Sequence, residues 1–235
     1  MFLYYTPDMI LIVAAVIPVF VLLTLAHRQD RTEAEPPRLL FKLAMMGIVA
    51  TTLAKLAERV GLFVLNALFR QPSLLYSIFL YFGLVAYAEE GAKYALLKHV
   101  TWRSPEFDCR FDGVVYAVFV SLGFALWENI GYVLMNGLGT ALMRAVTAIP
   151  GHACFGVFMG CWYAEAAALD RRGDEAYSRA ARTLAVAIPA LLHGAYDFLA
   201  AASTASAWVF LGFVAVMFGI TWRLVRRLAR ADQYV

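Results

Sequence analysis

The chain has 235 residues, of which 62% are hydrophobic and 16% are charged, and its mean hydropathy is +0.68. Soluble domains are about 45–50% apolar and about 25% charged, so this composition excludes an ordinary soluble protein and indicates an integral membrane protein. The formal net charge of +3 comes from basic residues that flank apolar stretches, which argues against a nucleic-acid partner. Because apolar stretches recur along the whole chain with short polar breaks, we expect one integral membrane domain over residues 1–235.

Seven stretches are apolar and long enough to cross a bilayer, which takes about 20 helical residues. They cover residues 9–26, 39–57, 74–97, 112–134, 144–167, 182–202 and 206–225. The expected fold is therefore an all-α, polytopic helix bundle in the cell membrane. The first stretch has no basic segment before it and no convincing cleavage site, so we expect a retained span and not a signal peptide.

The distribution of lysine and arginine predicts the orientation of these spans. With the N-terminus outside, the inner segments carry fifteen basic residues, and the outer segments carry Arg59, Arg70 and Arg144. Basic residues favour the inner side of the membrane, so the sequence predicts an N-out, C-in topology.

The segment 55–73 mixes three charged residues, Lys55, Glu58 and Arg59, with an apolar face. It either extends the second span or lies along the outer surface of the membrane as an amphipathic helix. We expect the surface helix, with a substrate-gating element as the alternative.

Away from the ends of the predicted spans, ionisable side chains are few, and they fall on four consecutive spans. In chain order they are Glu89, Glu90, Lys93, Glu128 (with Asn129 beside it), His152, His193 and Asp197. A charged side chain at the centre of a membrane helix costs about 2.5–3.5 kcal/mol on insertion scales, so such residues face the bundle interior and mark functional sites. We expect the four spans to enclose one shared polar pocket.

Helical spacing relates several of these residues. Glu89 and Lys93 lie four positions apart, on one face, and His193 and Asp197 repeat that spacing. Glu90 points about 100° away from Glu89, so the two carboxylates are expected to have different roles. The Glu89–Lys93 pair could be purely structural. However, one lysine cannot neutralise three glutamates, so we expect at least one carboxyl group to carry a proton or to act as a general base.

The two histidines have alternative interpretations. A hydrogen bond from His193 to Asp197 would orient the ring, which both catalysis and metal binding require. His152 could instead form a purely structural hydrogen bond between helices. Pro150 and Pro189 lie close before these histidines, so we expect bends there.

Three short motifs stand in order on separate spans: Glu89-Glu90-x-x-Lys93, Phe124-x-x-x-Glu128 and His193-x-x-x-Asp197. This arrangement resembles the PrsW family of intramembrane proteases, within the wider superfamily of CAAX-processing type II proteases and bacterial ABI proteins. The resemblance covers a core of about residues 76–198. It implies a glutamate-dependent endopeptidase that cleaves in or near the transmembrane segment of a membrane protein, such as a single-span anti-sigma factor.

The resemblance also implies roles for individual residues. The implied catalytic residues are Glu89, Glu90, Glu128, His193 and Asp197, with Lys93, His152 and Asn129 in support. Glu89 would be the base that activates water, and Glu128 its partner. Glu90 and Lys93 would shape the electrostatics of the site, whereas His193 and Asp197 would polarise the scissile carbonyl group or stabilise the oxyanion.

Metal dependence stays open at this point. The chain lacks the HExxH motif of helical zinc proteases. Zinc could still be bound by side chains from different helices, since a catalytic zinc needs three protein ligands and a water. The candidate ligands are Glu89, Glu128, His152 and His193. We expect a metal-free glutamic mechanism without a cofactor.

Departures from the CAAX enzymes narrow the substrate class. Lys93 replaces the arginine of their first motif one position early, Glu128 stands where they have histidine, and Asp197 where asparagine is common. These differences match the PrsW branch and argue against prenyl-cysteine substrates.

Two functions from other classes also fit the buried polar residues. Chains of Glu, His and Asp inside a membrane can relay protons in a proton- or ion-coupled transporter. Transporters often contain internal repeats, but the three motifs here are not copies of one another. A scaffold or immunity-type membrane protein that kept the fold without the chemistry is the other alternative.

Overall fold

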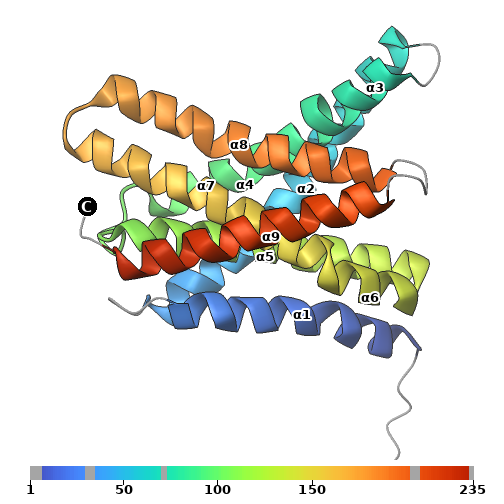
Figure 1. Cartoon of the computed structure of the whole chain (residues 1–235), viewed down its shortest axis with the longest axis horizontal. Coiled ribbons are helices and arrows are strands. Elements are labelled where there is room, and N and C mark those ends of the chain that lie inside the picture. Colours follow the sequence, from blue (N-terminus) through green and yellow to red (C-terminus); the bar gives the residue numbers. More distant parts are fainter. Residues whose placement is uncertain (1–6, 30–34, 70–72, 202–206, 233–235) are drawn as a thin grey trace, which may run out of the picture.

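The computed structural model describes residues 7–29, 35–69, 73–201 and 207–232, and within these ranges it contains helices and no β-sheet (Figure 1). The helices are α1 (Pro7–Gln29), α2 (Pro37–Leu68), α3 (Leu74–Ile78), the π-helix η1 (Phe79–Val85), α4 (Ala86–Thr101), α5 (Arg110–Asn136), α6 (Leu138–Val146), α7 (Ala148–Arg171), α8 (Glu175–Ala201) and α9 (Ala207–Arg230). The all-α fold predicted from hydropathy is confirmed.

Six helical stretches in the described ranges are long and apolar enough to cross a membrane: α1, α2, α5, α6 together with α7, α8 and α9. The remaining predicted span, residues 74–97, is formed by α3, η1 and α4, which follow one another without a break. The chain is therefore a multi-pass membrane protein. Its N-out, C-in orientation stays a prediction, and Arg31 and Arg70, which entered the charge count, lie outside the described residues.

The prediction of a surface helix at residues 55–73 is wrong for the part that the structure describes. Helix α2 runs unbroken to Leu68, and its buried positions include Ala50, Ala54, Glu58 and Leu65. These buried positions lie on one face of α2, and that face continues beyond residue 57, where the predicted span ends. Packing of this face keeps the whole helix in the bundle. Residues 70–72 lie outside the described part.

Helix α5 forms the centre of the bundle, where nearly every side chain from Phe111 to Ala125 is buried. Glycines allow its neighbours to approach closely. A Cβ atom at Gly123 would lie 2.0 Å from a backbone oxygen of α2, and one at Gly160 of α7 would lie 2.4 Å from a Cα atom of α5. Small residues at such crossings let membrane helices pack backbone to backbone.

Interruptions occur in the helices that carry the polar residues. The stretch predicted as one span at 144–167 is broken at Thr147, between α6 and α7, and Pro150 lies in the first turn of α7. Pro189 lies inside α8, one turn before His193. The π-helix η1 directly precedes α4, and π-helical segments are frequent at functional sites.

Candidate active site

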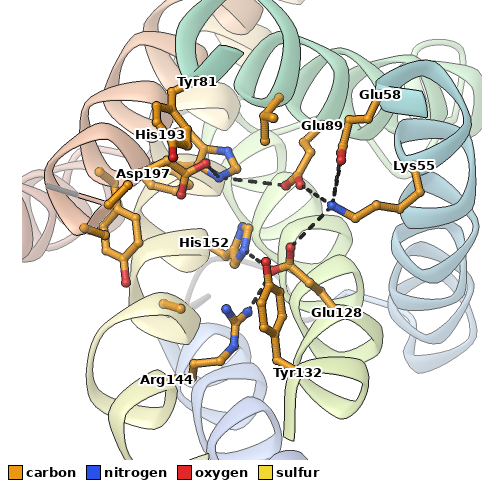
Figure 2. Close-up of a pocket in the computed structure, with 16 residues that line it drawn as sticks. Lys55, Glu58, Tyr81, Glu89, Glu128, Tyr132, Arg144, His152, His193 and Asp197 are labelled. Atoms are coloured by element: carbon orange, nitrogen blue, oxygen red, sulfur yellow. Dashed lines mark hydrogen bonds and ion pairs between the residues drawn. The ribbon is translucent and has the colours of Figure 1, made fainter. Parts of the chain in front are cut away.

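A cavity of about 370 Å³ lies among these interrupted helices, and its wall is polar (Figure 2). The charged or titratable side chains that line it include Lys55, Glu58, Glu89, Glu128, Arg144, His152, His193 and Asp197. The structure thus brings residues from all four predicted spans into one pocket, as expected. Of the eight residues selected from the sequence, Glu90, Lys93 and Asn129 do not line the cavity but lie behind its wall.

Glu89 projects into the cavity from the first turn of α4, with only 1% of its surface exposed. Its Oε1 atom accepts a hydrogen bond from Lys55 Nζ at 3.2 Å. Its buried Oε2 atom makes no hydrogen bond and lies 3.8 Å from His193 Nε2. Glu89 therefore lines the cavity with one carboxylate oxygen bonded to Lys55 and the other buried without a hydrogen-bond donor.

Glu90 and Lys93 form a fully buried ion pair behind Glu89. Lys93 Nζ donates to Glu90 Oε1 at 2.7 Å and to His152 Nδ1 at 3.1 Å. The distance from Lys93 Nζ to the nearest oxygen of Glu89 is 4.0 Å, so the pairing predicted from the i,i+4 spacing is weaker than the i,i+3 contact with Glu90. Positions three and four apart are both neighbours on a helix, and only the packing of α4 decides between them.

His193 is held by the same buried carboxylate. Its Nδ1 atom donates to Glu90 Oε1 at 2.9 Å, while Nε2 lies 3.5 Å from Asp197 Oδ2. The ring also stacks on Phe155 at a centroid distance of 4.7 Å. Asp197 is close to the ring, as predicted, but only as an ion-pair contact; the hydrogen bond that fixes the ring goes to Glu90.

Glu128 belongs to a network of hydrogen bonds that extends across the bundle to α1. Its Oε2 atom accepts hydrogen bonds from Arg144 Nη2 at 2.7 Å and from His152 Nε2 at 3.1 Å. Arg144 Nε also donates to Asn129 Oδ1 at 2.8 Å, and Asn129 Nδ2 donates to the backbone oxygen of Ala15 at 2.9 Å. Asn129 thus anchors the arginine that holds Glu128.

Sequence reasoning missed three charged residues of the cavity wall. The sequence predicts a surface segment for Lys55 and Glu58 and an outer boundary for Arg144, yet all three line the cavity. Lys55 lies at its mouth with 42% of its side chain exposed, 3.0 Å from Glu58 and 3.9 Å from Glu128. The mixed charges at positions 55–59 were the sequence signal that pointed to this segment.

Comparison with known proteins identifies the family. A family model described as "PrsW family intramembrane metalloprotease" matches residues 35–222. The chain belongs to the PrsW family. Family membership makes it an intramembrane protease, and it speaks against the transporter that the buried polar residues also suggested.

Relatives of this PrsW-family chain cover nearly its full length. Proteins named "Protease PrsW" from Geobacillus kaustophilus and Bacillus subtilis are 32% and 29% identical to it, over 95% and 94% of this chain and 93% and 95% of their own lengths. The one from Clostridioides difficile is 30% identical over 80% of this chain and 78% of its own length. No solved structure matches the chain significantly.

The PrsW family description implies a metal, and three side chains of the site are close enough together to be considered as its ligands. Glu89, His152 and His193 each offer an atom within 4.8 Å of the other two, whereas Glu128 does not join this group. Glu89 and His193 suit a metal, because Glu89 Oε2 makes no hydrogen bond and His193 donates through Nδ1 and presents Nε2 to the cavity.

His152 does not complete this ligand set. An ammonium group can only donate, so His152 Nδ1 must accept from Lys93 and the ring proton must sit on Nε2, where it donates to Glu128. Neither nitrogen then has a lone pair for a metal. Because a catalytic zinc needs three protein ligands, this hydrogen-bond arrangement does not fit one.

Proposed function

We propose that this PrsW-family protease is a metal-free glutamic endopeptidase in which Glu89 is the general base. The observation that carries the proposal is the distribution of hydrogen-bond donors among the buried carboxylates. Glu90 and Glu128 each accept two charged or ring donors, whereas Glu89 accepts only Lys55. The Oε2 atoms of Glu89 and Glu90 both lack a hydrogen bond, but of these two residues only Glu89 lines the cavity. A carboxylate with fewer donors is less stabilised as an anion and takes a proton more readily.

In the proposed reaction, Glu89 Oε2 removes a proton from a water molecule as the water oxygen attacks the scissile carbonyl carbon. His193, protonated on both nitrogens, donates from Nε2 to the developing oxyanion, and Asp197 at 3.5 Å stabilises that charged ring. Glu89 then passes its proton to the amide nitrogen as the C–N bond breaks. Water is thereby divided between the new carboxyl and amine groups.

The other buried residues have positioning roles in this mechanism. Glu90 holds the His193 ring through Nδ1, and Lys93 neutralises Glu90. Glu128, fixed by Arg144 and His152, lies across the cavity from Glu89, where it is the partner that orients the attacking water (Figure 2).

The position of the cavity among membrane helices supports a membrane-embedded substrate. A peptide bond reaches the cavity most directly from a transmembrane segment that unwinds locally, so we propose a single-span membrane protein resembling an anti-sigma factor. The three ordered motifs also support placing the chain in the superfamily of CAAX-processing proteases and ABI proteins, but without a prenylated substrate.

The test is cleavage of a panel of single-span substrates by the purified protein. Glu89→Gln is expected to lower the rate by about 10²–10⁴-fold, which is the usual contribution of general acid–base catalysis. The matched control Glu165→Gln removes a carboxylate on α7 that pairs with Arg110 outside the cavity and should leave the rate unchanged.

Three results would contradict the proposal or parts of it. Full activity in Glu89→Gln would show that Glu89 is not the general base. Loss of cleavage with a chelator, restored by zinc, would keep the peptidase assignment and overturn its metal-free form. Absence of cleavage by the folded wild type across the whole panel would favour a protein that kept the fold without the chemistry.

A further inference from the structure

A second hollow lies on the opposite side of α7 from the candidate active site. It is an apolar groove of about 320 Å³ between α1 and α9, with α5 and α7 as its floor. Its lining includes Leu22, Val118, Ala153, Phe218 and Val225, and none of the residues in the proposed mechanism. We call it the α1–α9 groove.

One end of the α1–α9 groove is basic. Gln29 and Trp222 line both the groove and an adjoining hollow of about 350 Å³, whose other wall includes Arg226 and Arg230. The guanidinium group of Arg226 lies 4.8 Å from the centre of the Trp222 ring. Arg223 completes this basic end, and among the described residues none of these arginines forms an ion pair with a carboxylate.

The two helices that border the groove, α1 and α9, are both candidate membrane spans. Both are long and apolar enough to cross the membrane, and their C-terminal ends lie at the same end of the bundle (Figure 1). With α1 and α9 crossing the membrane, the apolar groove would face the lipid chains and the arginines near the C-terminal ends would face the headgroups. Arginines beside a groove between membrane helices suit a lipid phosphate.

The chemistry of the two parts distinguishes a lipid from a partner helix. An apolar helix would cover the groove but would leave the adjoining arginines without an anion. A soluble acidic peptide would suit the arginines but not an apolar groove at membrane depth. A single acyl chain joined to a phosphate suits both parts.

We propose that the α1–α9 groove with its basic end is a binding site for an anionic phospholipid. One acyl chain lies in the groove, and the phosphate is bound by Arg226 and Arg230, with Gln29 as a further donor. This site is separate from the proposed catalysis, so it stands whether or not Glu89 is the base.

Native mass spectrometry of the purified full chain tests this site with two lipids of identical acyl chains, phosphatidylglycerol and phosphatidylcholine. The wild type is expected to retain phosphatidylglycerol more strongly. Arg226→Gln combined with Arg230→Gln should weaken phosphatidylglycerol binding roughly 25-fold, from about 1 kcal/mol per arginine and 1.4 kcal/mol per factor of ten.

Two further variants separate this site from general attraction to negative charge. Arg172→Gln combined with Arg179→Gln removes the same charge from the exposed α7–α8 turn and the start of α8, and should leave binding unchanged. Val225→Trp fills the groove, keeps every arginine, and should weaken the binding of both lipids.

Three outcomes would overturn the proposal. The first is equal retention of the two lipids by the wild type. The second is an equal loss in the Arg172/Arg179 control, which would show that total charge alone attracts the lipid. The third is unchanged binding in Val225→Trp, which would show that the groove is not occupied; this measurement also decides the matter if the double arginine variant does not fold.

Discussion

Removal of the buried ammonium group at Lys93 is the most direct test of the polar core. Lys93 and Glu90 both have fully buried side chains, and their charged atoms are 2.7 Å apart. In Lys93→Met the carboxylate of Glu90 loses its cation and keeps only the contact with His193. Removing one partner of a buried ion pair typically costs about 3–5 kcal/mol, because the remaining charge cannot be hydrated.

This cost translates into a measurable loss of thermal stability. At about 2–4 °C per kcal/mol for a chain of this size, the melting temperature in detergent should fall by roughly 10 °C. Lys98→Met is the matched control, because Lys98 lies on the same helix, is only half-buried and contacts the Trp102 ring without an ion pair among the described residues. Its effect should stay within about 0.5 kcal/mol.

The double variant Lys93→Met with Glu90→Gln separates charge from packing. With both charges removed, no uncompensated ion is buried, so most of the lost stability should return. Activity should stay low, because a glutamine amide does not hold a protonated His193 ring as a carboxylate does. A melting temperature for Lys93→Met equal to that of wild type, or no recovery in the double variant, would refute the buried ion pair.

Three further variants test other parts of the site and the bundle. Arg144→Lys should lower peptidase activity on the order of tenfold, because one ammonium group cannot replace the two guanidinium N–H groups that bind Glu128 and Asn129; wild-type rates would contradict this role. Gly123→Ala should destabilise the protein by about 1–3 kcal/mol or more in thermal unfolding, because the added Cβ atom would lie 2.0 Å from the α2 backbone. Gly91→Ala is the control and should leave stability unchanged, because its Cβ atom would have no neighbour within 4 Å. Lys55→Met should lower kcat in the cleavage assay without unfolding the protein, since Lys55 is half-exposed yet bonds Glu89; equal losses of kcat and melting temperature would indicate a structural role instead.

The bundle could be predicted from the sequence because its determinants are local. Hydropathy over about 20 residues locates each span, and the cost of burying a charge turns the few ionisable residues inward. The cavity accordingly contains Glu89, Glu128, His193 and Asp197, each from a predicted span. The register of Gly123 against α2 had no such local signal, since it depends on how two distant segments cross.

Partner choice within the site could not be predicted for a related physical reason. Lys55 and Arg144 lie at the ends of predicted spans, where basic residues are also expected at the membrane surface. Whether such a residue faces water or a cavity depends on the length of its helix, and α2 proved longer than its apolar stretch. The choice of Glu90 over Glu89 as the partner of Lys93 likewise depends on the rotation of α4 against its neighbours.

The adjacency of Glu89 and Glu90 then has a physical explanation. Two consecutive carboxylates on a helix point about 100° apart, so one can face a cavity while the other faces the packed interior. Glu90 takes the interior position and accepts from both Lys93 and His193, which fixes the ring that faces the substrate. Glu89 takes the cavity position and accepts a hydrogen bond from Lys55 alone. Exchanging the carboxylate for an amide should therefore have different effects at the two positions: Glu90→Gln should lower both stability and activity, whereas Glu89→Gln should lower activity at nearly unchanged stability. Equal losses of stability in the two variants would contradict this division.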